Sequence, residues 1–492
     1  MEDKENAKER KAGRMGKRSR FIISGLALLL VLLLSGSALA EDVHMELEKG
    51  TLLGGACIRG VGSVSWVEGL QKEGDGVSVT MEVPESGFYD IVIRSASMDG
   101  SHKENHVAVD GERVGEVICE GVSFADNCVE YVYLAQGTHE IAITSYWGWV
   151  KLDSVTLRPS SALPEDVWQV APTLVNPDAD ENALRLMRYL CSIYGRQMLS
   201  GQYCDTGMNG KEMTVIEQVT GRKPAVLGLD MIELSPSRAK YNGGGSRVIE
   251  YAKEWWEAGG IVTFCWHWNV PEKYFTDIWW KGFYTDTVSI DLAKIMGGED
   301  PEGYELLMRD IDVIAGYLAE LRDAGVPVLW RPLHEASGGW FWWGAAGAEA
   351  YRQLYITMYE KLTVEHNLTN LIWVWNGQSP DWYPGDAYVD IIGDDIYAGN
   401  RVYTTQAARF LQAVRTPGTR KLVMLTENGC LIDPELAERD HILWGMFCTW
   451  QGEFVQQDGK LSEQYNDADM LRKVYGSDLV LTLDELPELR HD

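Results

Sequence analysis

Hydrophobic and polar positions follow two different periods along the chain, and the change between them marks two regions. Between residues 42 and 158, apolar and polar residues alternate in short segments that are separated by turn-forming residues. These segments lie at residues 77–83, 87–94, 106–111, 129–134, 139–144 and 150–157. Because a period of two is the pattern of half-buried strands, this region is predicted to be an antiparallel β-sandwich.

From about residue 165 onward, short apolar runs alternate with longer stretches of helical period. The helical stretches include residues 183–194, 248–258, 304–324 and 348–365. Eight apolar runs lie at residues 198–202, 225–230, 261–267, 328–334, 371–376, 391–397, 423–427 and 446–450. Eight strands that alternate with helices in about 320 residues predict a (β/α)8 barrel. An open doubly wound sheet is the alternative, but no glycine-rich phosphate loop opens its first helix.

Two further segments complete the expected domain organisation. Residues 159–168 contain two prolines and two serines, which predicts a linker between a sandwich at 42–158 and a barrel at 169–490. The first twenty residues include eight basic ones, an apolar run follows, and an Ala-Leu-Ala cleavage site ends at Ala40. We therefore expect a signal peptide of residues 1–40 and a secreted, extracellular protein, with an uncleaved membrane anchor as the alternative.

The charge balance excludes several classes of partner. The net charge at pH 7 is −29, and removal of residues 1–40, which carry eight basic and four acidic side chains, would bring it to −33. Binding to nucleic acid or to an anionic membrane depends on a basic surface, so neither partner is expected once the signal peptide is removed. A strongly acidic exported chain suits a neutral ligand, and we expect a monomer.

Eight cysteines are spread thinly along the chain, which is not the pattern of a disulfide scaffold. Cys119 with Cys128, and Cys430 with Cys448, are close enough in sequence to be candidate disulfide pairs. No CxxC pair or histidine-cysteine cluster in the sequence indicates a zinc site.

Two glutamates stand where apolar runs stop. Glu335 follows the fourth run, in the segment Arg331-Pro-Leu-His-Glu335, and Glu427 ends the seventh run. A charge at the end of a buried strand does not serve packing, and strands four and seven of a barrel lie across its mouth from each other. Cleavage of a glycosidic bond needs one acid and one carboxylate, so two such residues suffice without a metal or redox cofactor. A salt bridge at each strand end is the alternative.

Aromatic and imidazole side chains gather at the same strand ends. Of the nineteen tryptophans, Trp340 and Trp450 are the ones we expect to contact a sugar, because indole faces stack on the C–H faces of sugar rings. His267 and His334 also end runs and are expected to point into the same cleft, although a strand-end histidine often serves only as a structural hydrogen-bonder. Tyr397 ends the sixth run, where its hydroxyl is placed to hydrogen-bond the second glutamate.

At these residues the chain resembles glycoside hydrolase family 26, which is typified by β-mannanases. The resemblance rests on Arg331-Pro-Leu-His-Glu335 and on the Gly-Gly-Trp340-Phe-Trp-Trp-Gly344 segment that follows it. Further matching motifs are Leu199-Ser-Gly-Gln202, Thr263-Phe-Cys-Trp-His267, Asp395-Ile-Tyr397, Thr426-Glu-Asn-Gly429 and Cys448-Thr-Trp450. The resemblance covers about residues 170–490.

The resemblance implies a retaining mechanism, with Glu335 as acid/base and Glu427 as nucleophile, and therefore carboxyl groups about 5 to 5.5 Å apart. It also implies Trp450 as the floor of the −1 sugar site, His267 beside that site, Trp340 on the leaving-group side, and His334 and Tyr397 as residues that orient the nucleophile and the bound sugar.

The first region resembles family 35 carbohydrate-binding modules, through Met45-Glu-Leu-Glu48 and Tyr146-Trp-Gly-Trp-Val-Lys-Leu-Asp153. This resemblance implies a structural calcium, for which Glu46, Glu48 and Asp153 supply carboxylate oxygens. It also implies a sugar platform at Trp147 and Trp149, with Asn127 as the polar partner. Ordinary solvent-facing acids are the alternative to the metal site.

Together these features predict a secreted endo-acting glycoside hydrolase with a binding module ahead of its barrel. The resemblance implies β-1,4-linked mannan, glucomannan or galactomannan as the substrate. A mixed-linkage β-1,3-1,4-glucanase or a β-xylanase on the same scaffold stays an alternative, because the residues that distinguish an axial from an equatorial 2-hydroxyl are not evident in the sequence. A non-catalytic polysaccharide-binding protein is the alternative of another class, but loss of a glutamate would be expected there, and both are present.

Overall fold

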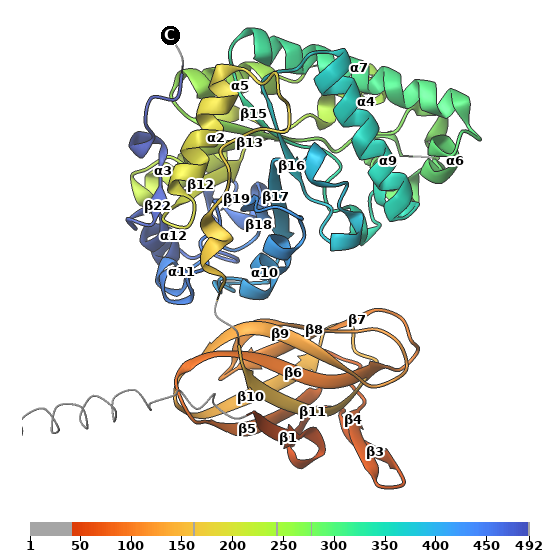
Figure 1. The fold of residues 1–492 in the computed structure, drawn as a ribbon, viewed down its shortest axis with the longest axis vertical. Coiled ribbons are helices and arrows are strands. Elements are labelled where there is room, and N and C mark those ends of the chain that lie inside the picture. Colours follow the sequence, from red (N-terminus) through yellow and green to blue (C-terminus); the bar gives the residue numbers. More distant parts are fainter. Residues whose placement is uncertain (1–41, 161–162, 243–244, 277, 491–492) are drawn as a thin grey trace, which may run out of the picture.

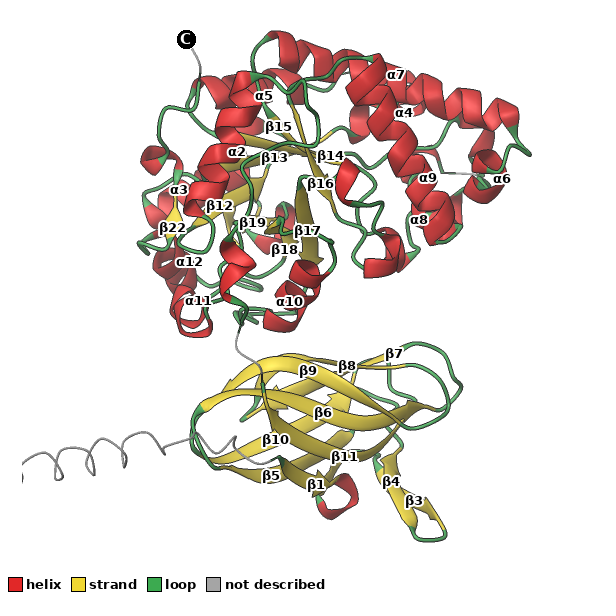
Figure 2. Cartoon of the chain, viewed as in Figure 1, coloured by secondary structure: helices red, strands yellow, loops and turns green. Residues whose placement is uncertain are grey.

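The computed structural model describes residues 42–160, 163–242, 245–276 and 278–490. The expected signal peptide, residues 1–40, lies outside these ranges. Figures 1 and 2 show two bodies, an all-β module and a larger α/β barrel, which follow each other along the chain.

The N-terminal module is a sandwich of two antiparallel sheets. Its strands are β1 (Val43–Glu46), β2 (Thr51–Leu53), β3 (Cys57–Val61), β4 (Val64–Glu68), β5 (Gly76–Val83), β6 (Gly87–Ser97), β7 (Lys103–Val109), β8 (Glu112–Cys119), β9 (Ala125–Leu134), β10 (Gly137–Ser145) and β11 (Val150–Pro159). One sheet has the order β3-β4-β11-β6-β9, with β1 also paired to β11, and the other has the order β2-β5-β10-β7-β8. Val77, Ile91, Ile141 and Leu152 are fully buried in the core. The sandwich prediction is confirmed, and β1 to β4 and β8 are strands that the alternation did not reveal.

The second body is a closed parallel barrel. Its strands are β12 (Met198–Tyr203), β13 (Val226–Asp230), β14 (Ile261–Cys265), β15 (Val328–Arg331), β16 (Leu371–Trp375), β17 (Ile391–Ile396), β18 (Leu422–Asn428) and β19 (Met446–Thr449). Strands β13 to β19 pair in chain order, and β12 pairs with both β13 and β19, which closes the ring. A short strand, β22 (Val480–Leu481), pairs beside β12, and β20 (Gln456–Gln457) and β21 (Lys460–Leu461) form a separate hairpin. Each of the eight predicted runs is a barrel strand, so the (β/α)8 prediction is confirmed.

Every residue of the eight barrel strands is buried. Helices cover the outer face and side chains fill the interior, which explains why the strands appear in the sequence as unbroken apolar runs. Polar side chains are therefore concentrated where the strands end.

Helices surround the barrel (Figure 1). They are α2 (Glu181–Ile193), α3 (Lys211–Thr220), α4 (Pro236–Asn242), α5 (Val248–Glu257), α6 (Leu292–Met296), α7 (Pro301–Asp323), α8 (Trp342–Ala345), α9 (Ala348–Tyr359), α10 (Ala407–Arg415), α11 (Pro434–Asp440) and α12 (Ala468–Tyr475). Asp180, Asp300 and Asp467 are the N-cap residues directly before α2, α7 and α12, and the side chain of each accepts a hydrogen bond from a backbone N–H of the first turn. Within the described ranges, no helix combines the length and apolar character needed to cross a membrane.

The strand that precedes Glu335 is shorter than its apolar run. Strand β15 ends at Arg331, three residues before the predicted end at His334. Leu333 and Glu335 both take the left-handed conformation, with φ of 54°, which residues other than glycine seldom adopt. The chain therefore turns sharply away from the strand at the point where candidate residues stand.

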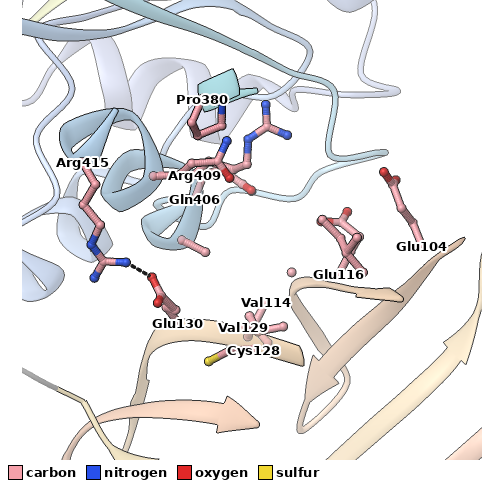
Figure 3. Close-up of a pocket in the computed structure, with 14 residues that line it drawn as sticks. Glu104, Val114, Glu116, Cys128, Val129, Glu130, Pro380, Gln406, Arg409 and Arg415 are labelled. Atoms are coloured by element: carbon pink, nitrogen blue, oxygen red, sulfur yellow. Dashed lines mark hydrogen bonds and ion pairs between the residues drawn. The ribbon is translucent and has the colours of Figure 1, made fainter. Parts of the chain in front are cut away.

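The module packs against the barrel through strand β9, which lies along α10 (Figure 1). Arg415 on α10 forms an ion pair with Glu130 on β9, with a nitrogen–oxygen distance of 2.6 Å. Arg113 on β8 donates to the backbone carbonyl of Ala398 at 2.6 Å. A cavity of about 410 Å³ lies between the two bodies, and Figure 3 shows Glu130 of the module and Arg409 and Arg415 of the barrel at its wall.

All eight cysteines fall within the described ranges and are free thiols. The structure therefore contradicts both candidate disulfide pairs, Cys119 with Cys128 and Cys430 with Cys448. The thiols have other partners: Cys119 donates to Ser95 Oγ at 3.0 Å, and Cys430 donates to a backbone carbonyl at 2.8 Å.

Candidate active site

A cleft opens at the carboxyl ends of the barrel strands. Its volume is about 460 Å³, and its lining residues are Asp205, Asp230, Ile232, His267, Phe283, Tyr284, Glu335, Trp340, Phe341, Tyr397, Glu427, Trp450 and Gln451. Six of the seven site residues that the sequence placed on the barrel are in this set. The exception is His334, which is 1% exposed and lies behind the cleft wall.

The two glutamates approach each other in this cleft. Glu427 lies in β18, next to its last residue, and Glu335 follows β15 in the left-handed turn. One carboxylate oxygen of each lies within 4.8 Å of the other, and an oxygen of Asp395 lies within the same distance of both. At this separation the negative charge of one carboxylate disfavours ionisation of its neighbours.

A buried arginine binds two of these acids. The Arg331 guanidinium is fully buried, its Nη1 donates to Asp395 Oδ2 at 2.7 Å, and its Nη2 donates to Glu427 Oε1. Burial opposes the charged guanidinium, but the negative charges around it, Asp395 first, raise the pKa of Arg331 well above its usual value. The Tyr397 hydroxyl donates to the other oxygen, Glu427 Oε2, at 2.7 Å. Both oxygens of Glu427 are thus held in fixed directions.

The position of Glu335 favours its protonated form. Burial raises the pKa of Glu335 well above its usual value, and the charges of Asp395 and Glu427 raise it further. Trp340 Nε1 donates to Glu335 Oε2 at 2.9 Å, which favours the charged form but is outweighed. Burial also raises the pKa of Asp395 to about 7, although Arg331 opposes the shift. Glu335 therefore keeps its proton at pH values where ordinary carboxyl groups have lost theirs.

Two histidines contact each other, one at the cleft and one buried behind it. His267 Nδ1 lies 2.6 Å from Asp230 Oδ2, and His267 Nε2 lies 3.2 Å from His334 Nε2. Burial lowers the pKa of His267, but Asp230 outweighs it and raises the pKa above its usual value. Burial, with the charges of Arg331 and His267, lowers the pKa of His334 well below its usual value. A charged His267 can donate to a neutral His334, so His334 supports its neighbour instead of facing the cleft as the sequence suggested.

The tryptophans divide into cleft residues and packing residues. Trp340 is 46% exposed at the cleft, and Trp450 packs against Tyr203 with the ring centroids 4.6 Å apart. The fully buried tryptophans near the same strand ends are Trp266, Trp268, Trp342 and Trp343. Of these six tryptophans in the described ranges, Trp340 and Trp450 are the two that line the cleft.

Several polar residues at or near the cleft were missed by sequence reasoning. They are Asp205, Asp230, Asn376, Asp395 and Gln451. Gln451 donates to Asp205 Oδ2 at 2.8 Å, and burial with the charge of Asp230 raises the pKa of Asp205 to about 7. Asp230, Asn376 and Asp395 stand at or near the ends of counted apolar runs, so the signal that revealed the glutamates was also available for them.

On the module, the two expected platform residues are exposed. Trp147 and Trp149 are 48% and 49% exposed, and they lie in the loop between β10 and β11. Asn105 holds this loop, because its Oδ1 accepts two backbone N–H groups of the loop at 3.1 and 3.0 Å. Asn127 lies on β9, where its amide donates to Ser95 Oγ at 2.8 Å. A ligand on the tryptophans would therefore lie over a loop that Asn105 shapes.

The three acids expected to bind calcium influence one another. Burial raises the pKa of Asp153, as do the charges of Glu46 and Glu48, while Arg94 opposes the shift. Glu48 Oε1 accepts from Ser65 Oγ at 2.9 Å, and its Oε2 is buried with no hydrogen-bond partner in the described part of the chain. A buried, unpartnered carboxylate oxygen beside two further acids fits a hard cation.

A closed parallel barrel with two adjacent carboxyl groups in an aromatic cleft, at the carboxyl ends of its strands, is the arrangement of a glycoside hydrolase. Comparison with known families agrees with this class. Residues 175–485 match the profile of glycosyl hydrolase family 26, and residues 43–160 match the profile of carbohydrate binding module family 35. The chain belongs to glycosyl hydrolase family 26 and carries a family 35 module, so both resemblances seen in the sequence are confirmed.

Individual relatives match between 65% and 92% of this chain. A mannan endo-1,4-β-mannosidase of Thermothelomyces thermophilus is 40% identical, over 92% of this chain and 91% of its own. The crystal structure of a GH26-CBM35 β-(1,4)-mannanase of Podospora anserina is 38% identical and matches 92% of this chain and 99% of that one, with a TM-score of 0.63. A β-mannanase from a symbiotic protist of the termite Reticulitermes speratus, solved with a gluco-manno-oligosaccharide, is 33% identical over 65% of this chain and 98% of that one, with a TM-score of 0.56.

Proposed function

We propose that this protein is a secreted endo-β-1,4-mannanase that hydrolyses mannan, glucomannan or galactomannan with retention of configuration. The observation that carries the proposal is the approach of Glu335 and Glu427 to within 4.8 Å. That spacing suits a retaining enzyme, with carboxyl groups about 5 to 5.5 Å apart, and leaves too little room for the water of an inverting enzyme, which needs about 6.5 to 9.5 Å. Two relatives that match 92% and 94% of this chain are named mannan endo-1,4-β-mannosidases, which supports the substrate.

In the first step, a carboxylate oxygen of Glu427 attacks the anomeric carbon while Glu335 gives its proton to the glycosidic oxygen. The bond between the anomeric carbon and that oxygen breaks, the leaving sugar departs as an alcohol, and a glycosyl ester forms on Glu427. The raised pKa of Glu335 suits the proton donor. Arg331 and Tyr397 hold the two oxygens of the nucleophile in place during the attack.

In the second step, Glu335 is a carboxylate and takes a proton from water. The water oxygen attacks the anomeric carbon, the ester to Glu427 breaks, and the sugar is released with its original anomeric configuration. Both residues return to their starting states, so one glycosidic bond is hydrolysed for one water consumed, without a redox or metal cofactor.

The remaining cleft residues are proposed to position the polysaccharide. Trp450 provides the floor of the −1 sugar site, and His267 contacts that sugar, because both line the cleft. Trp340 contacts the leaving-group side, next to the acid that its indole nitrogen binds. On the module, Trp147 and Trp149 supply an exposed aromatic platform for the same polysaccharide.

The function can be tested by the release of reducing ends from galactomannan, glucomannan, barley β-glucan and β-1,3-xylan. We expect activity on the first two, and we expect Glu427→Ala to abolish it because the variant lacks the proposed nucleophile. Proton NMR of the first product should show the β-anomer. Activity on none of the four substrates would exclude the proposed enzyme, and near-native turnover by Glu427→Ala would exclude the proposed nucleophile.

The raised pKa of Glu335 predicts the shape of the pH profile. The acid works only when protonated, so kcat/KM for mannopentaose should fall as pH rises through this pKa, above the usual carboxyl range. With 2,4-dinitrophenyl β-mannobioside, whose leaving group needs no proton, the same descending limb should be absent. An identical descending limb with both substrates would show that another group controls it.

We also propose that calcium binds to Glu46, Glu48 and Asp153 and stabilises the module. Within the described ranges, the carboxylate oxygens of these three acids do not all lie within 4.8 Å of one another. An ion would therefore draw the acids closer together. The ion would neutralise three carboxylates that otherwise repel, and it would compete with Arg94, whose Nε lies 3.3 Å from Asp153 Oδ2.

Calcium should therefore raise the unfolding temperature of the purified protein. Binding at a concentration of about 100 times Kd stabilises the folded state by about 2.7 kcal/mol. Asp153→Ala should remove the calcium response, while Glu112→Ala, which removes an exposed acid elsewhere on the module, should keep it. An equal response in both variants, or no response in the parent protein, would rule out the site.

A further inference from the structure

A buried amide lies between the two glutamates. Asn376 follows β16 and has no exposed surface. The backbone N–H of Glu335 donates to two oxygens of Asn376, the backbone carbonyl at 2.8 Å and the side-chain Oδ1 at 3.1 Å. On its other side, Asn376 Nδ2 donates to Asp395 Oδ1 and to Thr426 Oγ1, both at 2.8 Å. Every polar atom of this side chain is thus used.

These contacts join both halves of the active site. Asp395 is the acid that shares Arg331 with Glu427, and Thr426 is the residue directly before Glu427. The amide therefore contacts the backbone of one glutamate and the immediate neighbours of the other. A shift of Asn376 would change the position of Glu335 relative to Glu427.

The conformation of Glu335 explains why such a contact is needed. Its φ of 54° is in the left-handed region, where a side chain crowds the backbone, so the turn persists only if surrounding groups hold it. Its N–H donates to Asn376 at this turn. A glutamate on a looser turn would still be present but would not aim its proton at the glycosidic oxygen.

We propose that Asn376 is a positioning residue that holds the acid/base Glu335 in its left-handed turn, in register with the nucleophile. The inference rests on the proposed roles of the two glutamates. It predicts a selective defect, because only the reaction that needs proton donation depends on the aim of Glu335.

The test compares two substrates. For Asn376→Ala, kcat/KM for mannopentaose should fall at least about tenfold, since a misplacement of about 1 Å can cost about a hundredfold in rate. For 2,4-dinitrophenyl β-mannobioside, kcat/KM should change less than about threefold, because its leaving group departs without a proton. Asn376→Asp, which keeps the shape and loses both donors, should show the same selectivity. The ratio of the two values does not depend on the fraction of folded enzyme.

Asn370 offers a matched control. It is buried without exposed surface just before the other end of β16, and its Nδ2 donates to the Val326 carbonyl at 3.0 Å. Asn370→Ala should lower stability without changing the ratio between substrates. Glu335→Ala must show the selective defect, or the proposed acid role fails. If Glu335→Ala shows it and both Asn376 variants lose activity on both substrates equally, the positioning role is wrong.

A second, independent observation concerns the module. Arg113 donates to the carbonyl of Ala398, the residue directly after Tyr397, and the Tyr397 hydroxyl donates to the proposed nucleophile Glu427. Ala398 is followed by Gly399 with φ of 99°, in the region that favours glycine. An arginine of the binding module therefore binds the residue next to Tyr397, whose hydroxyl holds the proposed nucleophile.

We infer that the module, through Arg113, positions the Tyr397 loop and so contributes to catalysis apart from its own sugar binding. This inference rests on the proposed role of Tyr397. The step that it affects is the attack by Glu427, which both substrates require. Loss of the Arg113 contact should therefore lower kcat/KM equally for mannopentaose and for 2,4-dinitrophenyl β-mannobioside, in contrast to the selective loss expected of the Asn376 variants.

A double-mutant cycle separates this role from a general effect of the interface. Tyr397→Phe and Arg113→Met should each lower kcat/KM on both substrates, and the double variant should lose little more than Tyr397→Phe alone, because one contact acts through the other. Arg415→Met removes a different arginine contact across the interface and should stay within about twofold of the parent.

The outcomes are distinct. An unaffected Tyr397→Phe would remove the proposed role of that tyrosine. A clear defect in Tyr397→Phe, with Arg113→Met either fully active or additive with it, would overturn the inference about the module. Equal losses in Arg113→Met and Arg415→Met would show that any loosening of the interface has the same effect, which also contradicts a specific role of Arg113.

Discussion

The active site depends on one buried positive charge. Arg331 has no exposed surface, and removing a guanidinium from water costs several kcal/mol unless acids bind it. Asp395 and Glu427 are those acids, and they in turn would repel each other without it. Three carboxyl groups lie within 4.8 Å, and the arginine binds two of them directly. Of the three carboxyl groups, Glu335 has the least contact with Arg331, so Glu335 is the one that keeps a proton.

This division of charge follows from where the side chains leave the barrel. Glu427 extends from the regular strand β18 and meets Arg331, which ends β15. Glu335 comes four residues later, beyond the left-handed turn, and meets the indole of Trp340 instead. Two residues of the same type thereby acquire different chemistry from the length of a short loop. The strand ends fix Arg331 and Glu427, and the left-handed turn places Glu335 in a different environment.

The sequence predicted the architecture well because buried parallel strands must be continuous apolar runs, and all eight runs are strands. It also revealed Glu335 and Glu427, since a charge at such a strand end has no packing role. The direction of a side chain beyond a strand was not predictable. His334 appeared equivalent to His267, but the left-handed residue before it, Leu333, accompanies a chain turn that leaves His334 behind the wall. Asn376 was missed for a related reason: its importance lies in contacts with segments far away in the chain.

The module shows the same limits. Alternation identified six of the longer strands, while the short strands β1 to β4 carry too few residues for a period to be evident. Strand β8 was missed although it has eight residues. The role of Asn127 as polar partner of Trp147 stays a prediction; the structure places Asn127 on β9 beside Ser95, and it shows that Asn105 of β7 holds the tryptophan loop. Which residues of a sandwich meet depends on strand order, and strand order is not evident in local patterns.

The free cysteines have a consequence for where and how the chain can fold. No covalent bond between thiols holds either body, and burial raises the pKa of Cys265 and Cys448 well above that of an exposed thiol. The reactive form of cysteine is the thiolate, so these side chains are protected from oxidants by the fold itself. The described fold contains no disulfide bond, so an oxidising catalyst is not needed to form one.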